Sequence, residues 1–312
     1  MENEKVLEVD NLHVSFQTYA GEVKAVRGVS FELKKGETLA FVGESGCGKT
    51  VTAKAVMRLL KPPFAEIKPE SKIVCNGKDV MKMTDKELYK FRGDEISMIF
   101  QDPMTSLNPT MTIGKQIMES LIIHRGMNKA EARKEAIRML EMVKIPSPES
   151  RIDNYPHELS GGMRQRVMIA IALACNPKIL IADEPTTALD VTIQAQIMDL
   201  MRELKEKSNT AIILVTHDLG VVANFADRIQ VMYAGQVVER GTAREIFYES
   251  KHPYTWALLS SVPKVTNESK EELYALKGTP PDLLLPLHEC HLHPDVSTAW
   301  ESVKREIQER HP

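Results

Sequence analysis

The N-terminal part of the chain alternates apolar and polar residues in the manner of β-strands. Residues 5–16 and 22–33 follow this period of two, and an apolar run covers residues 38–42. A helix is predicted next, over residues 50–60. Residues 1 to about 80 are therefore predicted to be rich in strands and interrupted by one helix.

Helical patterns dominate the middle of the chain, from about residue 84 to 175. Thr84, followed three residues later by Glu87, has the form of a capping box that starts a helix. Apolar residues recur at helical spacing over residues 128–143, and two prolines soon follow that segment. These patterns predict a helical subdomain in this part of the chain.

Short apolar runs, typical of strands buried on both faces, return after residue 175. They cover residues 179–182, 211–215 and 228–232, and a helix is predicted between them at residues 192–207. This alternation predicts an α/β fold with a parallel sheet. From Gly241 onward the composition changes to a proline-rich tail with aromatic residues.

The composition is that of a globular protein and narrows the function classes. The chain has 312 residues, 43% of them hydrophobic, which is enough for one large domain with an appendage. A net charge of −3 without a long basic block gives no support for binding to nucleic acid. No apolar run approaches the roughly 18 residues that span a bilayer, and the N-terminus lacks the pattern of a signal peptide.

The cysteines are scattered without paired spacing, which favours a reducing compartment and no disulfide framework. They are Cys47, Cys75, Cys175 and Cys290. We therefore expect a cytosolic chain that reaches a membrane only through a partner.

The most informative motif is the glycine-rich segment after the apolar run 38–42. It reads Gly-Glu-Ser-Gly-Cys-Gly-Lys-Thr over residues 43–50, between a predicted strand and a predicted helix, which is the form of a phosphate-binding P-loop. Its glycines let successive N–H groups face one point, and the helix adds its positive dipole end. Lys49 is then expected to reach the β- and γ-phosphates, and the Thr50 hydroxyl to coordinate Mg²⁺.

A second phosphate-facing segment precedes a strand that ends in two carboxylates. Ser160, Gly161 and Gly162 open an apolar helix, whose N-terminal N–H groups and dipole favour an anion. At the end of the later strand, Asp183 suits an outer-sphere contact to Mg²⁺, and Glu184 suits positioning or deprotonating a water molecule. One chain therefore carries two separate segments suited to phosphate.

Together these segments resemble the ATP-binding cassette (ABC) ATPases, and the resemblance covers nearly the whole chain. Met163 stands where that family most often has glutamine, while the Ser-Gly-Gly core before it is intact. The resemblance implies a RecA-like core with an antiparallel β subdomain, a helical subdomain and a short C-terminal extension. It also implies a dimer in which nucleotide lies between the P-loop of one subunit and the Ser-Gly-Gly segment of the other.

Further residues match the family's motifs one by one. Gln101 matches the glutamine that reaches Mg²⁺ and links nucleotide to the helical subdomain, and His217 matches the histidine at the γ-phosphate. Residues 188–190, which end in Asp190, match the loop that touches the opposite subunit. Each residue alone is a weak signal, but all of them occur in the order that the family requires.

The resemblance therefore implies three sets of site residues. The catalytic residues are Glu184, His217 and Lys49. The Mg²⁺ ligands are Thr50, Gln101 and Asp183. The residues expected to contact ATP are Tyr19, Gly43, Ser45, Gly46, Cys47, Gly48, Lys49, Thr50, Thr52, Gln101, Ser160, Gly161, Gly162 and Asp190.

Two aromatic residues compete for the position that stacks on adenine. Tyr19, just before a strand-like run, fits best. Phe16 is the rival, but it alternates with Leu12 and Val14 at a period of two, which favours a place in the core.

Three stretches outside the ATPase motifs resemble the ATP-binding subunits of bacterial dipeptide and oligopeptide importers. They are Phe-Gln-Asp-Pro-Met-Thr-Ser-Leu-Asn-Pro at residues 100–109, His-Pro-Tyr-Thr at 252–255 and Lys-Gly-Thr-Pro-Pro-Asp-Leu at 277–283. The resemblance implies ATP-driven peptide import with two integral-membrane permeases, a second similar ATPase subunit and, indirectly, an extracytoplasmic binding protein. It places the chain at the cytoplasmic face of the cell membrane, with permease contacts in the loop after Gln101.

On this interpretation residues 1–260 form the nucleotide-binding domain and residues 261–312 an extension. The substrate stays open, because nickel, glutathione and oligosaccharide importers share the same ATPase type. A soluble ABC ATPase of translation or DNA maintenance is disfavoured, because this chain has a single P-loop and no inserted coiled coil. A partner that binds nucleotide without hydrolysing it is disfavoured by the intact catalytic residues.

The C-terminal tail departs from the resemblance. Many members of the subfamily continue with cysteines that can hold an iron–sulfur cluster, whereas Val296 stands where the next cysteine is expected after Cys290. A cubane cluster needs about four thiolates, so we expect no iron–sulfur cluster. Zinc binding by the nearby side chains is a weaker alternative. Those side chains are His288, Cys290, His291 and His293.

Overall fold

Residues 4–186, 190–261, 283 and 284 are described by this computed structural model of the chain. The chain divides into two compact units, each described here by itself. The first unit comprises Met1–Glu8, Glu32–Leu39 and Ile73–Thr216. The second unit comprises Val9–Phe31, Ala40–Lys72 and His217–Pro312.

Parallel strands form the centre of the first unit. β7 (Ile96–Ile99) pairs with β8 (Ile179–Asp183), and β8 pairs with β9 (Ala211–Val215). Every residue of β8 and β9 is buried, and apart from Asp183 all of them are apolar without alternation, as is typical of strands covered on both faces. The backbone N–H of Ile212 donates to the carbonyl oxygen of Glu37 at 2.8 Å, so the chain segment before the P-loop lies beside β9.

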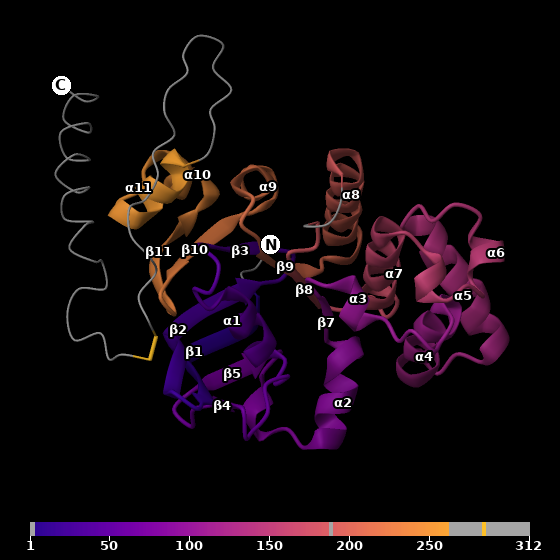
Figure 1. Cartoon of the computed structure of the whole chain (residues 1–312), viewed down its shortest axis with the longest axis horizontal. Coiled ribbons are helices and arrows are strands. Elements are labelled where there is room, and N and C mark those ends of the chain that lie inside the picture. The colour runs from indigo at the N-terminus through magenta and orange to yellow at the C-terminus, as the bar shows by residue number, and fades with distance from the viewer. Residues whose placement is uncertain (1–3, 187–189, 262–282, 285–312) are drawn as a thin grey trace, which may run out of the picture. The chain divides into compact units, whose positions relative to one another are not determined.

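Helices make up most of the remaining first unit. Helices α4 (Ile113–Arg125), α5 (Lys129–Met142) and α7 (Gly161–Leu173) contact one another (Figure 1), and each has buried apolar residues, among them Leu121, Leu140 and Val167. The helices are α2 (Asp85–Asp94), α3 (Pro103–Ser106), α4 (Ile113–Arg125), α5 (Lys129–Met142), α6 (Pro148–Arg151), α7 (Gly161–Leu173) and α8 (Val191–Ser208). The short elements are β5 (Lys72–Cys75), β6 (Lys78–Asp79) and the 3₁₀ turns η1 (Val80–Lys82) and η2 (Pro156–Glu158).

The capping boxes of the first unit confirm where its helices start. Thr84 Oγ1 accepts from the backbone N–H of Glu87, whose carboxylate accepts from the backbone N–H of Thr84, so α2 begins as the sequence predicts. One strand, β7, interrupts the stretch that the sequence pattern assigns to helices. Four residues are too few for periodicity to separate a strand from a helix, and pairing with β8 decides the outcome.

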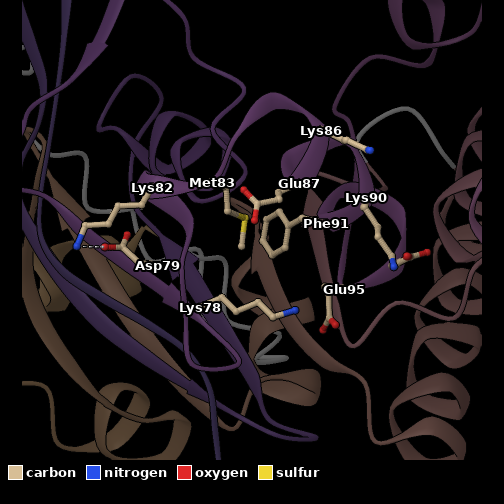
Figure 2. Close-up of a pocket in the computed structure, with 10 residues that line it drawn as sticks. Lys78, Asp79, Lys82, Met83, Lys86, Glu87, Lys90, Phe91 and Glu95 are labelled. Atoms are coloured by element: carbon tan, nitrogen blue, oxygen red, sulfur yellow. Dashed lines mark ion pairs between the residues drawn. The ribbon is translucent and has the colours of Figure 1, made fainter.

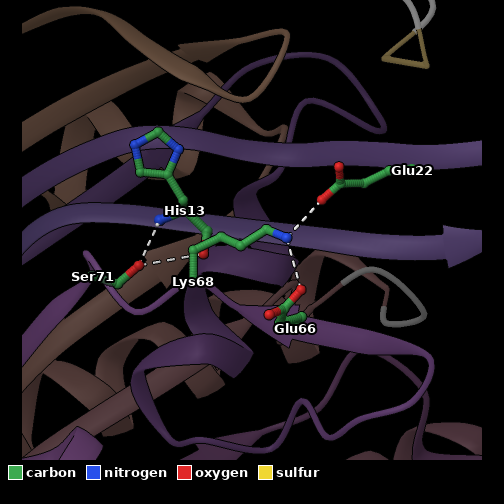
Figure 3. A network of polar contacts seen from close by, with 5 residues as sticks. All are labelled: His13, Glu22, Glu66, Lys68 and Ser71. Atoms are coloured by element: carbon green, nitrogen blue, oxygen red, sulfur yellow. Dashed lines mark hydrogen bonds and ion pairs between the residues drawn. The ribbon is translucent and has the colours of Figure 1, made fainter.

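Antiparallel strands begin the second unit. Most of β1 (Lys5–Thr18) and of β2 (Gly21–Lys34) belongs to it, and β4 (Ala65–Ile67) pairs with β1. The ammonium of Lys68 lies 2.8 Å from Glu22 on β2 and 2.7 Å from Glu66 on β4, as Figure 3 shows. Hydrogen bonding to these two carboxylates raises the pKa of Lys68, so the cation that joins the strands stays charged.

The rest of the second unit leads into and out of the P-loop. A tight turn at Ala234 and Gly235, both with positive φ, joins the antiparallel strands β10 and β11. The elements are β3 (Thr38–Val42), α1 (Lys49–Val56), α9 (Leu219–Phe225), β10 (Arg228–Tyr233), β11 (Gln236–Thr242), α10 (Ala243–Tyr248) and α11 (Pro253–Ser260). None of the helices in the described part of the chain is long and apolar enough to span a membrane.

Candidate functional site

Three glycines give the P-loop its shape between β3 and α1. Gly43, Gly46 and Gly48 have backbone φ values of +145°, +79° and +102°, which residues other than glycine rarely adopt. A Cβ on Gly43 would lie 2.2 Å from the carbonyl oxygen of Met232, and one on Gly48 would lie 2.6 Å from that of Ala25. Both glycines are therefore required by close backbone approach as well as by conformation.

Lys49 is the first residue of α1 and is held by the loop itself. Its side chain is buried, and Nζ donates to the carbonyl oxygens of Gly43 and Glu44, each at 2.7 Å. An ammonium has three N–H donors: two meet these carbonyl oxygens, and Nζ also lies 3.6 Å from the Cys47 sulfur, a weak acceptor that a phosphate oxygen could replace. The N-terminal end of α1 adds its dipole at the same place.

The remaining P-loop residues have different surroundings. Ser45 is exposed and Thr50 is half-buried, so both can meet a ligand. Burial raises the pKa of the Cys47 thiol, which keeps it protonated and unreactive. Thr52, also predicted to contact ATP, is buried, and its backbone N–H donates to the carbonyl oxygen of Gly48.

The first unit brings Gln101 and Glu184 together. Asp183 ends β8 and is buried, and Glu184 follows it with a φ of +47°, an uncommon conformation for a residue with a side chain. The backbone N–H of Glu184 donates to the carbonyl oxygen of Val215 at 2.8 Å, which fixes this turn to β9. The side-chain amide of Gln101 donates to the Glu184 carboxylate at 3.0 Å, a contact that the sequence analysis does not predict.

Sequence reasoning missed one residue of this region, Gln165 on α7. Its side chain is 1% exposed, and its amide donates to the carbonyl oxygen of Pro185 at 2.7 Å. The bond ties α7 to the turn that carries Glu184. A glutamine among the apolar residues of a buried helix face is a signal that could have found it, because a buried amide needs a partner.

Two helix starts carry further predicted residues. Ser160 is the N-cap of α7, and its hydroxyl accepts from the backbone N–H of Met163 at 3.4 Å. Gly161 is exposed with open space beside it, so the start of α7 is accessible, and Gly162 is half-buried. Asp190 caps α8 by accepting from the backbone N–H of Ile193 at 3.0 Å.

The remaining predicted positions are His217 and residues in or near segments that the structure does not describe. His217 is exposed and belongs to the second unit, as do the P-loop residues. Ala188 and Leu189, the tail cysteine Cys290 with its neighbouring histidines, and almost all of the extension 261–312 lie outside the described residues.

The oxygen donors expected at the metal site are chemically suited to Mg²⁺. Thr50, Gln101 and Asp183 offer a hydroxyl, an amide carbonyl and a carboxylate, and this ion combines a few such groups with water and substrate phosphate. Within the described ranges no cluster of three His, Cys, Asp or Glu side chains could hold a metal ion by itself. The chemistry of these three donor groups, taken one by one, therefore suits Mg²⁺.

The two aromatic residues that compete for the position on adenine differ in how exposed they are. Tyr19 lies fully exposed in the turn between β1 and β2. Phe16 is half-buried and pairs with Ala65, so it is not the core residue that its spacing suggests. The simple alternation fails because Val14 and Ser15, although neighbours, are both buried.

We expect Tyr19→Ala to weaken ATP binding by about 1–3 kcal/mol, the usual contribution of stacking between a base and an aromatic ring. Phe16→Ala should have a smaller effect, and equilibrium titration with a fluorescent ATP analogue measures both. An unchanged affinity in Tyr19→Ala together with a reduced one in Phe16→Ala would reverse the assignment.

A separate pocket of about 550 Å³ lies in the first unit, between β6 and the end of α2 (Figure 2). Its lining has four lysines and four carboxylates, with Met83 and Phe91 between them, so its formal charges balance. Two of these residues form an ion pair, with Lys82 Nζ 3.3 Å from Asp79 Oδ2. The pocket contains none of the predicted site residues.

Comparison with known proteins relates most of the chain to two sequence families. Residues 26–187 match the family described as ABC transporter, and residues 238–295 match the family described as oligopeptide/dipeptide transporter, C-terminal region. The oligopeptide transport ATP-binding protein OppD of Bacillus subtilis (strain 168) is 60% identical over 282 residues, which cover 90% of this chain and 78% of that protein. The dipeptide transport ATP-binding protein DppD of Lactococcus lactis subsp. cremoris (strain MG1363) is 60% identical over 287 residues, covering 92% and 81%.

A solved structure supports the same relationship. The ATP-binding cassette MJ0796, determined as a dimer in a post-hydrolysis state bound to ADP and phosphate, matches this fold with a TM-score of 0.69. It is 32% identical to this chain, and the match covers 76% of this chain and 99% of that one. The predicted α/β class, with a parallel sheet and an antiparallel β part, is thereby confirmed.

Proposed function

This chain belongs to the ABC transporter family, and on that premise we propose that it is the ATP-hydrolysing subunit of a complex that imports dipeptides and oligopeptides. The observation that carries the substrate class is the match of residues 238–295 to the oligopeptide/dipeptide transporter C-terminal region. Relatives that are 60% identical over about nine-tenths of this chain are transport ATP-binding proteins for oligopeptides and dipeptides. The intact P-loop and the Asp183–Glu184 pair supply the ATPase part of the proposal.

In the proposed cycle, ATP draws two such subunits together. The P-loop and Lys49 of one subunit hold the phosphates, and the exposed start of α7 at Ser160 in the other subunit meets the same nucleotide. A nucleotide that contacts both halves binds the closed dimer better than the open one, and this difference in affinity shifts the equilibrium.

Hydrolysis requires a water molecule in line with the γ-phosphate and groups that stabilise the developing charge. We assign the first task to Glu184, which Gln101 orients through the 3.0 Å hydrogen bond, and the second to Lys49 and His217. Mg²⁺, held by Thr50, Gln101 and Asp183, would neutralise charge on the β- and γ-phosphates.

The partners follow from the same proposal. Two integral-membrane permeases would contact the loop after Gln101, where Met104 of α3 is 63% exposed despite being apolar. A second, similar ATPase subunit would complete the dimer, and an extracytoplasmic binding protein would deliver the peptide. The chain would then lie at the cytoplasmic face of the cell membrane, attached through the permeases.

We expect a strain that lacks this chain to lose uptake of labelled dipeptides and oligopeptides. Uptake should return with the parent chain and not with Glu184→Gln, because transport requires hydrolysis. Uptake of nickel, glutathione and oligosaccharides is measured in the same strains. Loss of one of those activities with normal peptide uptake would assign the chain to another importer. A pull-down with this chain that recovered ribosomes or DNA and no membrane proteins would contradict a transport role.

A further inference from the structure

A tyrosine near the C-terminal end of the described cassette contacts the P-loop directly. The backbone N–H of Glu44 donates to the hydroxyl oxygen of Tyr254 at 3.0 Å. Tyr254 lies on α11 and is 2% exposed, and its ring packs on Tyr233 with 4.6 Å between ring centroids. All these residues belong to the second unit, so the contact is internal to one compact body.

Glu44 is held from both sides of its backbone. Its N–H donates to Tyr254, and its carbonyl oxygen accepts from the ammonium of Lys49 at 2.7 Å. The position of the carbonyl that seats Lys49 therefore depends on the tyrosine hydroxyl. One residue links the C-terminal helix to the cation that meets the phosphates.

The segment before α11 fixes where Tyr254 lies. The carboxylate of Glu239 on β11 accepts from the backbone N–H groups of Lys251 at 2.7 Å and His252 at 3.2 Å. His252 Nδ1 in turn accepts from the backbone N–H of Tyr254 at 3.2 Å. Burial lowers the pKa of His252, which keeps the ring neutral and able to accept.

We propose that Tyr254 is a positioning residue that couples the C-terminal region to nucleotide binding. Through Glu44 it holds the P-loop in the form that seats Lys49 for phosphate, so movement of α11 changes the affinity for ATP. Because coupling between two sites is reciprocal, ATP at Lys49 also stabilises α11. The proposal rests on the ATP-binding part of the function above and not on the transported substrate.

The coupling has a definite chemical basis. The loop N–H of Glu44 loses its partner when the hydroxyl is removed, while a phenylalanine ring keeps the packing on Tyr233. Loss of a single buried hydrogen bond corresponds to about a three- to tenfold change in an equilibrium constant. Tyr254→Phe is therefore expected to raise the Kd for MgATP by about that factor.

The test compares Tyr254→Phe with Tyr233→Phe in the full chain. Tyr233 supplies a matched control, because its ring belongs to the same pair, whereas among the described residues the hydroxyl that accepts from the P-loop is that of Tyr254. MgATP affinity is measured by titration, and thermal unfolding shows whether each variant is folded. Tyr233→Phe should keep the parent affinity.

Hydrogen exchange gives a readout that a purely structural role would not move. In the parent chain MgATP should slow amide exchange across residues 253–260, and in Tyr254→Phe this nucleotide-dependent protection should be lost. Exchange around Glu44 should also become faster in Tyr254→Phe without nucleotide. Parent-like affinity in Tyr254→Phe, or no effect of MgATP on residues 253–260 of the parent, would overturn the inference. Failure of peptide uptake in cells would instead contradict only the proposed transport function.

Discussion

Glu184→Gln should abolish ATP turnover while ATP binding is preserved. General acid–base catalysis contributes about 10²- to 10⁴-fold in rate, and an amide cannot accept the proton of the attacking water. The glutamine keeps an oxygen that can accept from Gln101 Nε2, which now lies 3.0 Å from the carboxylate, so the geometry should survive. The measurement is steady-state phosphate release by the assembled complex, with ATP affinity determined in parallel.

A surface carboxylate provides the control for this variant. Glu203 on α8 pairs with Lys207 at 2.9 Å and is well exposed, so Glu203→Gln should leave turnover unchanged. With bound ATP, Glu184→Gln should accumulate as a closed dimer, which light scattering detects. Turnover near the parent rate in Glu184→Gln would remove this residue from the catalytic role proposed for it.

Lys49→Ala should weaken ATP binding by about 10- to 100-fold, because a hydrogen bond to a charged group contributes about 1.5–3 kcal/mol. The loss should appear in the Kd itself and therefore precede any effect on hydrolysis. Direct titration with MgATP is the measurement.

Lys54→Ala on the same helix is the matched control, since Lys54 lies in the last turn of α1, away from the start that faces phosphate. Lys49 also donates to two carbonyl oxygens, so thermal unfolding of Lys49→Ala is needed to separate lost binding from lost stability. A folded Lys49→Ala variant with the parent Kd would contradict the assignment of this motif.

Local signals are sufficient for much of the fold. β8 and β9 begin at Ile179 and Ala211 as predicted, because unbroken apolar runs between polar segments leave little choice of boundary. The capping box of α2 is a local motif and is also predicted correctly. The end of α1 is predicted less accurately. The sequence pattern extends this helix to residue 60, whereas in the structure it stops at Val56 and Arg58 adopts a φ of +48°.

Contacts between segments that are distant in the chain could not be predicted from the sequence. Nothing in the spacing of residues shows that Gln165 bonds to the carbonyl of Pro185, or that Tyr254 reaches Glu44. These bonds join positions 20 and 210 residues apart. Only the folded backbone brings them together, so motif recognition finds the P-loop but not the residue that holds it.

The candidate site shows the same division. The predictions for the glycines and Lys49 follow from the physics of phosphate binding. In the structure these glycines have positive φ values and Lys49 bonds to the loop itself. The assignments of Gln101, Asp190 and His217 come from family resemblance, because their residue types alone have many ordinary roles. Asp190 illustrates this, since the structure also gives it a plain role as the N-cap of α8.

The buried bond of Gln165 has a consequence for how two sites in a dimer would communicate. Ser160, the N-cap of α7, meets the nucleotide of the opposite subunit in the proposed dimer. Pro185 follows Glu184, to which the same proposal assigns the subunit's own nucleotide. A shift of α7 on engaging one ATP would pass through a 2.7 Å hydrogen bond to the turn that aims the other site's carboxylate. Hydrolysis should therefore respond to ATP cooperatively, with a steeper than hyperbolic dependence on its concentration.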